Sequence, residues 1–422
     1  MTIPNTTTAP ADDLLPRVGY RDVLREPYAK RLLAGTLIGR LPTGMAPLAI
    51  LVTATHAYGA ASGAASGAAL AALYLLASAV GGPLIGRQVD RQGQPVVFAV
   101  SAALSNAGLL LVAAQLHQPW CAVTGVAVAG ATKATLDSGL RALWGSGPGS
   151  VMPTPAHQRT ALALDATSQE IIYIAGPLLV AALTMTGPAS GALVATAALG
   201  IAGTAMVVTT PPSRSWPAAP GRRADWLGPL RSEQLCTLYV AMAGVGVPMG
   251  ALTPRAADAA AQFGSPMLSG ALPAVLSAGA VAGGLVYGSR TWPGTPIHHL
   301  IILAVSYAVG WLPLTLAGSA TTAVLATAVP GLVMAPLLGC AFVVTGEIAP
   351  HGTVTEAHAL LVASLDVGCA AGAASAGLVP ATALLPAGAA AGALVLVATR
   401  RRLTVTGRPP LPANPLPRGS LS

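Results

Sequence analysis

The sequence predicts an all-α membrane protein with twelve transmembrane helices, arranged as two pseudo-symmetric six-helix bundles. Three observations support this prediction. Only 9% of the 422 residues are charged, long apolar stretches recur along most of the chain, and Lys and Arg gather in every second gap between them. A stretch of roughly 20 apolar residues can cross a bilayer as a helix, because a helix satisfies its own backbone hydrogen bonds.

The expected helices follow one another closely along the chain. Many are rich in Ala and Gly rather than Leu, so the prediction depends on the whole array more than on any single member. The expected helices cover residues 32–54, 64–86, 95–115, 120–141, 161–184, 189–209, 234–253, 267–288, 299–317, 321–345, 357–380 and 383–399.

The distribution of basic residues predicts the orientation. Arg and Lys occupy both tails and the gaps after the second, fourth, sixth and eighth helices, whereas the other gaps hold only Arg255. Because cytoplasmic loops carry the excess of Lys and Arg, we expect a cell-membrane protein with both termini in the cytoplasm. The net charge of +8 then reflects topology and attraction to anionic lipid, not nucleic-acid binding. The first thirty residues do not resemble a signal peptide, so the first helix is the expected insertion signal.

One long polar gap divides six helices from six. Residues 210–233 are rich in Pro and Arg and have no apolar period, which is typical of a linker. The expected organisation is a cytoplasmic tail (1–31), an N-terminal six-helix bundle (32–209), a cytoplasmic linker (210–233), a C-terminal six-helix bundle (234–399) and a cytoplasmic tail (400–422).

The two expected bundles repeat parts of their sequence. The glycines of G-G-P-L-I-G (81–86) recur in register in G-G-L-V-Y-G (283–288), each time at the end of a helix. A second match aligns the fifth helix with the eleventh and places Glu170 on Asp366. Parallel six-helix repeats put the substrate site of a transporter near the bilayer midplane, between the halves.

A loop motif strengthens this interpretation. The run G-R-Q-V-D-R-Q-G over residues 86–93 resembles the signature loop of the major facilitator superfamily, G-x-x-x-D-R-x-G, at the same topological position. The later basic pair of that loop is missing, and the second-half copy has lost its acid. Gly176-Pro177 in the fifth helix resembles the Gly-Pro element of antiporters in the superfamily, without its further glycines. The resemblance covers residues 30–400 and implies a drug-efflux-like transporter. The excess of Arg over Lys suggests a GC-rich, bacterial genome.

The signature loop has a physical interpretation. Gly86 allows close approach of two helices, and Asp90 is expected to face the positive N-terminus of the eleventh helix, where T-V-T-E (353–356) reads as a capping box. The resemblance implies that Gly86, Asp90, Arg91 and Gly93 form a latch between the halves on the cytoplasmic side. The alternative is a tight basic turn that serves topology alone.

Five ionisable residues fall inside expected helices, where a charge costs at least about 2.5–3.5 kcal/mol. Glu170 and Asp366 are near mid-helix, Arg40 precedes Pro42 in the first helix, and Lys133 and Asp137 are four apart in the fourth. A function in proton coupling or in the substrate cavity is therefore the first hypothesis for Glu170, Asp366 and Arg40, since a carboxyl in an apolar site can bind and release a proton.

Each of these residues has a structural alternative. Glu170 is otherwise a packing residue that pairs with Arg40, and Arg40 otherwise extends toward the headgroups. Lys133 and Asp137 are expected to form an intramembrane ion pair of structural importance on one helix face. Asp165, near the cytoplasmic end of the fifth helix, is interpreted as a gate or structural residue.

Arg141 begins an R-x-x-x-G-x-G spacing that matches the helix-four motif of the superfamily. It follows about twenty apolar residues, however, whereas the motif belongs early in that helix. We therefore interpret Arg141 as a loop residue that serves topology, and Trp144 as an interfacial anchor.

The sequence contains no phosphate-binding loop, catalytic triad or metal-ligand spacing, and its four cysteines are scattered. We expect no enzyme, no cofactor and no metal. The expected function is alternating-access transport of a small molecule by a monomer in lipid, as proton-coupled efflux. The alternatives are an uptake carrier or facilitator for a sugar or metabolite and, in another class, a membrane sensor or scaffold that transports nothing.

Overall fold

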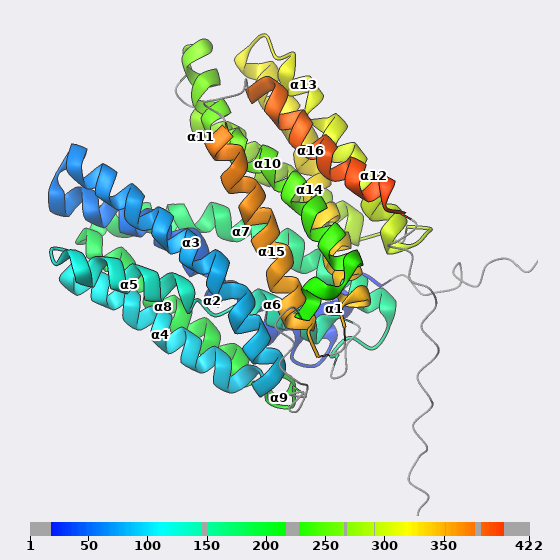
Figure 1. The fold of residues 1–422 in the computed structure, drawn as a ribbon, viewed down its shortest axis with the longest axis horizontal. Helices are drawn as coiled ribbons and strands as arrows, with labels where there is room; N and C mark the ends of the chain where they lie inside the picture. The colour runs from blue at the N-terminus through cyan, green and yellow to red at the C-terminus, as the bar shows by residue number, and fades with distance from the viewer. Residues whose placement is uncertain are drawn as a thin grey trace, which may run out of the picture.

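The computed structural model describes residues 18–145, 150–216, 228–265, 268–290, 292–350, 352–375 and 381–400. Every regular element in these residues is a helix (Figure 1), which confirms the predicted all-α class. In the first half, the helices are α2 (Ala29–Tyr58), α3 (Ala60–Gln92), α4 (Gln94–Gln115), α5 (Pro119–Ala131), α6 (Leu136–Trp144), α7 (Pro155–Thr186) and α8 (Ala189–Val208).

The second half repeats this order. Its helices are α10 (Glu233–Gln262), α11 (Leu268–Gly288), α12 (Pro296–Gly310), α13 (Leu312–Thr315), α14 (Ala320–Ile348), α15 (Val354–Ser375) and α16 (Ala381–Ala398). Three short helices lie outside this pattern: α1 (Tyr20–Arg25), α9 (Pro211–Arg214) and the 3-10 helix η2 (Gly228–Arg231).

Each predicted stretch coincides with one helix or with two consecutive short ones. Among the described residues, 10 helices are long and apolar enough to cross a membrane, and Ala383–Ala398 is a shorter apolar helix. Leu76, Val80 and Leu84 are exposed at four-residue spacing on α3. An exposed apolar stripe of this kind is expected on a helix that faces lipid.

The fourth predicted helix is not continuous. The sequence predicts one helix over 120–141, but α5 ends at Ala131 and α6 begins at Leu136. The Thr132 N–H keeps its helical bond to the Val128 carbonyl at 3.0 Å, but the Lys133 N–H bonds to the Gly130 carbonyl at 3.2 Å, a tighter i to i−3 bond of the kind that ends helices. The sequence does carry a signal of this break, since the apolar residues 121–131 are followed by T-K-A-T-L-D-S at 132–138.

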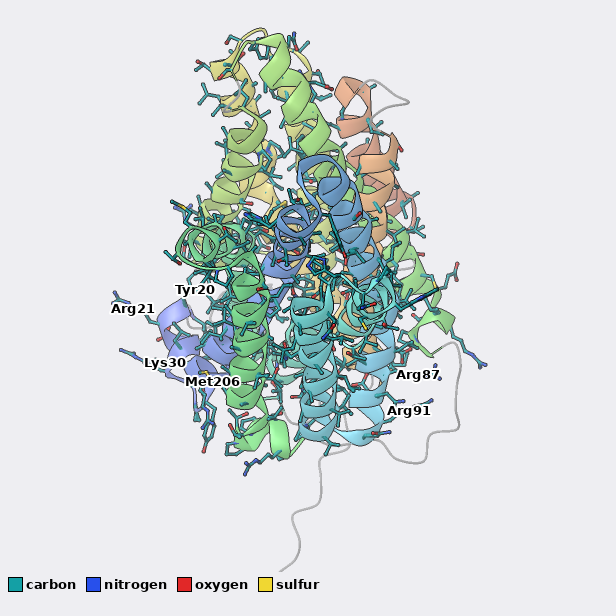
Figure 2. The ribbon with its side chains drawn as sticks, turned by 90° about the vertical axis from the view of Figure 1, so that its left-hand side faces the viewer. Tyr20, Arg21, Lys30, Arg87, Arg91 and Met206 are labelled. Carbon is teal, nitrogen blue, oxygen red and sulfur yellow. The ribbon has the colours of Figure 1, made fainter. Side chains whose placement is uncertain are left out.

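The two halves meet at one end and spread apart at the other (Figure 1). We call the end that holds α1, α6 and the start of α15 the closed end. Contacts between the halves pair α3 with α15 and α7 with α11 and α14. Arg21, Lys30, Arg87 and Arg91 lie in the lower part of the molecule in Figure 2. Arg21 belongs to α1, and Arg87 and Arg91 flank Asp90, which contacts the start of α15, so these three cations lie at the closed end.

Helix packing within the first half depends on glycine. A Cβ on Gly203 of α8 would lie 2.6 Å from the Gly35 carbonyl oxygen of α2 and would collide with the backbone of Gly39. The two helices are therefore in backbone contact, as small residues permit where lipid supplies no hydrophobic drive between helices.

We predict that Gly203→Ala destabilises the protein by about 1–3 kcal/mol, because the added methyl group forces α2 and α8 apart. The measurement is the thermal unfolding midpoint of the purified protein in detergent. Gly270→Ala is the matched control, since a Cβ on Gly270 of α11 meets no atom within 4 Å. Equal midpoints for the two variants would contradict this prediction.

Candidate functional site

The buried charges of the first half converge on Asp165 of α7. Arg40 of α2 donates from Nη1 to its Oδ1 at 2.9 Å, and Arg141 of α6 donates from Nε to its Oδ2 at 2.7 Å. Asp165 and Arg141 have no exposed surface, and Arg40 is 8% exposed. One carboxylate thus joins three helices of this half.

Two further side chains complete this group. Gln169 Oε1 accepts from Arg40 at 2.9 Å and from Arg141 at 3.0 Å, and Asp137 accepts from Arg141 Nη1 at 3.0 Å. We call these five residues the Asp165 cluster. Its two guanidinium groups and two carboxylates cancel in charge, as a buried ionic group requires.

The cluster contradicts one interpretation of Arg40, in which it extends toward the headgroups. Its guanidinium turns inward to Asp165 and Gln169 and does not extend toward headgroups. It is also not the partner of Glu170, because its hydrogen bonds go to these two other residues of α7.

The expectations for Arg141 and Trp144 are wrong. Both side chains are fully buried, so neither is a surface topology residue nor an interfacial anchor. The break between α5 and α6 shifts the position of Arg141 relative to a continuous helix, and Asp137 and Asp165 supply the counter-charges that allow its burial.

Arg141 also reaches the second half. Its guanidinium carbon lies 3.6 Å from the centroid of the Phe342 ring of α14, a cation–π geometry. The Phe342 carbonyl in turn contacts His358 Nε2 of α15 at 3.1 Å. The Asp165 cluster is therefore part of the contact between the halves at the closed end.

The expected ion pair between Lys133 and Asp137 is not seen. The two residues lie on either side of the helix break, and Asp137 pairs with Arg141 instead. Among the described residues, Lys133 forms no ion pair, although the opposite charges of Asp366 of α15 and of Asp137 act on it electrostatically. Lys133 thus faces a carboxylate of the second half.

Two exposed side chains lie between the halves. Tyr173 of α7 is 46% exposed, yet it interacts electrostatically with Arg40 of α2 and with Asp366 and Cys369 of α15. Asp366 is itself exposed. An exposed side chain that has charged neighbours in both halves lines the space between them and is accessible to a solute.

Glu170 lies one residue beyond Gln169, but on a different face of α7. Its side chain is 3% exposed, and its polar neighbour is Ser277 of α11 in the second half. The sequence repeat pairs it with Asp366, but the environments differ: one carboxyl is buried between α7 and α11, and the other is exposed.

Asp90 makes the contact that the sequence predicts for it. Its carboxylate accepts from the backbone N–H groups of Thr355 at 3.2 Å and of Glu356 at 2.9 Å, in the first turn of α15. A Cβ on Gly86 would lie 3.0 Å from the Thr355 carbonyl oxygen. Helices α3 and α15 of opposite halves therefore touch at Gly86.

The capping box predicted over 353–356 is not formed. Asp90 binds the Glu356 N–H that the Thr353 hydroxyl would bind in such a box. The Thr353 N–H and hydroxyl instead both donate to the Pro350 carbonyl, at 3.1 and 2.8 Å. The helix cap is supplied from the other half of the protein.

The remaining predicted residues have structural surroundings. Gly93 ends α3 with φ +91°, a conformation that favours glycine, and Arg91 lies in the last turn of that helix. Gly176, before Pro177 in α7, packs on the backbone of Gly44 in α2. Among the described residues, no group of three or more His, Cys, Asp or Glu forms a metal site.

Two halves of related helices that meet around buried charges make up this fold, which is also the fold of solved transporters of the major facilitator superfamily. No family model and no curated protein matches the sequence. The human organic anion transporter MFSD10 (TETRAN) has a similar structure, with TM-score 0.67 and 16% identity over 90% of this chain and 100% of that one.

Two further structures show the range of proteins with this fold. The superfamily's proton:xylose symporter XylE has TM-score 0.67 and 13% identity, over 88% of this chain and 94% of its own. A bacterial homologue of the iron transporter ferroportin, in an outward-facing state, has TM-score 0.65 and 12% identity, over 89% and 98%. At such low identity these likenesses show the fold alone.

We predict that Asp165→Asn destabilises the protein by about 3–5 kcal/mol, because it leaves two buried guanidinium groups facing one remaining carboxylate. Thermal unfolding in detergent measures the effect. Asp258→Asn is the control, since Asp258 is exposed on α10. A loss no larger than that of the control would mean that the Asp165 cluster contributes nothing to stability.

Proposed function

We propose that this chain is a secondary active transporter that moves a small molecule across the cell membrane by alternating access, as a proton-coupled exporter. The observation that carries the proposal is the position of the ionisable residues. Asp366 and Tyr173 are exposed between halves that spread apart at one end, while the Asp165 cluster and Asp90 join those halves at the other end. Alternating access requires a site between halves and contacts that can separate.

We place the closed end in the cytoplasm. The labelled cations Arg87 and Arg91 of Figure 2 lie on this side, and cytoplasmic loops carry the excess of basic residues. Both termini then lie in the cytoplasm, and the arrangement corresponds to an outward-open carrier, which we take to act as a monomer in the lipid bilayer.

Glu170 is the proposed proton carrier. It is buried between the halves, and Arg40, its nearest cation, hydrogen-bonds to Asp165 and Gln169. A proton on Glu170 would remove a charge that is costly to hold in an apolar site while the halves move past each other. Asp366, opposite Lys133, is proposed to bind substrate or to share the proton.

Two alternatives to proton-coupled export can be tested in the same transport assay in proteoliposomes. An uptake carrier or facilitator for a metabolite would use the same space between the halves without exporting anything, and the fold includes a symporter, XylE. A membrane sensor or scaffold would move no solute. The charges between the halves favour a carrier, since unused intramembrane charges are costly.

We predict that Glu170→Gln abolishes substrate-driven proton movement in proteoliposomes, because glutamine cannot take up and release a proton. The measurement is the internal pH of vesicles that contain the wild type or the variant, during a screen of cationic, anionic and neutral compounds. Glu26→Gln is the matched control, since Glu26 of the amino-terminal segment lies outside the helix array.

The outcomes of this assay separate the hypotheses. Movement of a compound without protons, or wild-type coupling in Glu170→Gln, would exclude coupling through Glu170 and favour a facilitator. Failure of every compound to move would favour the sensor or scaffold.

We propose that Gly86, Asp90, Arg91 and Gly93 form the latch that holds the closed end together. Asp90→Asn removes a full negative charge from the start of α15, a change of about 0.5–2 kcal/mol. We predict a larger population with the closed end open, measured as the distance between spin labels on Gln88→Cys and Ser289→Cys, both exposed and in opposite halves. An unchanged distance distribution would contradict the latch, and Asp258→Asn is the control.

A further inference from the structure

A segment that precedes the helix array lies between the two halves at the closed end. Helix α1 packs against α7 and α2, and its Val23 is fully buried. The start of α1 is fixed by Asp22, whose carboxylate accepts from the Gly19 N–H at 2.9 Å. This short helix is therefore anchored to the first half.

Tyr20 extends from α1 to the second half. Its hydroxyl donates to the Gly284 carbonyl of α11 at 2.5 Å. A Cβ on Gly288, one turn later in α11, would collide with the hydroxyl and ring of Tyr20. The tyrosine thus occupies a space that exists only because residue 288 is glycine.

The same segment is held on the other side by α7. Thr160 of α7 donates its hydroxyl to the Val18 carbonyl at 3.2 Å, and Thr167 of α7 is a polar neighbour of the Tyr20 hydroxyl. Residues 18–20 are therefore wedged between α7 of the first half and α11 of the second.

The internal sequence repeat relates the contact of Tyr20 at Gly288 to the contact of Asp90 near Gly86. Gly288 is the counterpart of Gly86, and at Gly86 the opposite half is held by Asp90 through the first turn of α15. In the second half the position of Asp90 is taken by Trp292, which donates to the Tyr287 carbonyl of its own half at 3.0 Å. The second copy of the loop thus provides no acid to join the halves.

We propose that Tyr20 replaces the missing acid and acts as a second clasp between the halves at the closed end, at the position related to the Asp90 contact by the internal repeat. Asp90 joins α3 to α15, and Tyr20 joins α7, through the amino-terminal segment, to α11. Opening of the closed end requires that both contacts separate.

The clasp is suited to a wide pH range. Burial raises the pKa of Tyr20 to about 12, so the hydroxyl keeps its proton and remains a donor to Gly284 under physiological conditions.

The test measures opening directly and does not require a substrate, so its result is independent of whether the protein transports anything. In the full chain with its four native cysteines replaced, Ala163→Cys of α7 provides the probe. Ala163 is buried and faces Gly339 of α14 across the halves. A soluble maleimide reaches this position in detergent only when the closed end opens.

We predict that Tyr20→Ala increases the labelling rate at position 163 by roughly threefold to tenfold or more, the change expected when a hydrogen bond and its packing are lost. Tyr20→Phe retains the ring against Gly288 and is expected to give a smaller increase. Arg21→Ala is the matched control, because Arg21 is the next residue of α1 and is exposed; its rate should equal that of the parent.

A parental labelling rate in Tyr20→Ala, with an unchanged unfolding midpoint, would overturn the proposal, as would an equal increase in Arg21→Ala. If Tyr20→Ala does not fold, Tyr20→Phe decides: a faster rate than in the parent supports the clasp, and a parental rate overturns the role of the hydrogen bond.

Discussion

The structure depends on a constraint that the membrane imposes: charges removed from water must be matched by other charges or hydrogen bonds. Asp165 meets this constraint for the first half. Its two oxygens bind Arg40 and Arg141, so that one residue of α7 fixes the relative positions of α2 and α6. Because Arg141 also stacks on Phe342, the position that Asp165 gives to Arg141 also determines how this half contacts the other.

The contacts between the halves share a physical character. Asp90 binds two backbone N–H groups, Tyr20 binds one backbone carbonyl, and Arg141 lies on an aromatic ring. Each contact adds a few polar atoms to an apolar core that continues from one half into the other. Contacts of this kind are individually modest in free energy, which suits halves that separate and meet again during a cycle.

Much of the fold was predictable because a segment that crosses a membrane must be both apolar and helical, and the local sequence shows where such segments lie. Apolar length gives the helices, and the contact of Asp90 with the start of α15 followed from its place in the signature loop. Arg141 could not be placed in this way. Counting apolar residues along the sequence predicts one helix over 120–141. The break at 132–135 instead places Arg141 in a separate helix, where it pairs with Asp165 and Asp137.

Other features of the site had no sequence signal. Gln169 is a neutral residue next to a more conspicuous glutamate, and only the folded chain shows that its oxygen serves both arginines. Tyr20 lies in a polar tail where nothing marks it as a contact. The glycine repeat shows that Gly288 has the register of Gly86 without an acid beside it, but it does not identify Tyr20 as the residue that packs there.

Because the Asp165 cluster is neutral and buried, we expect it to respond little to the salt concentration of the buffer. Dissolved ions screen charges over about 8–10 Å in physiological buffers, but only where they can approach. Counter-ions reach the exposed pair of Arg25 and Asp22, whereas Asp165 and Arg141 have no surface exposed to them. The architecture of the first half is therefore set independently of ionic strength, which acts mainly on the periphery of the molecule.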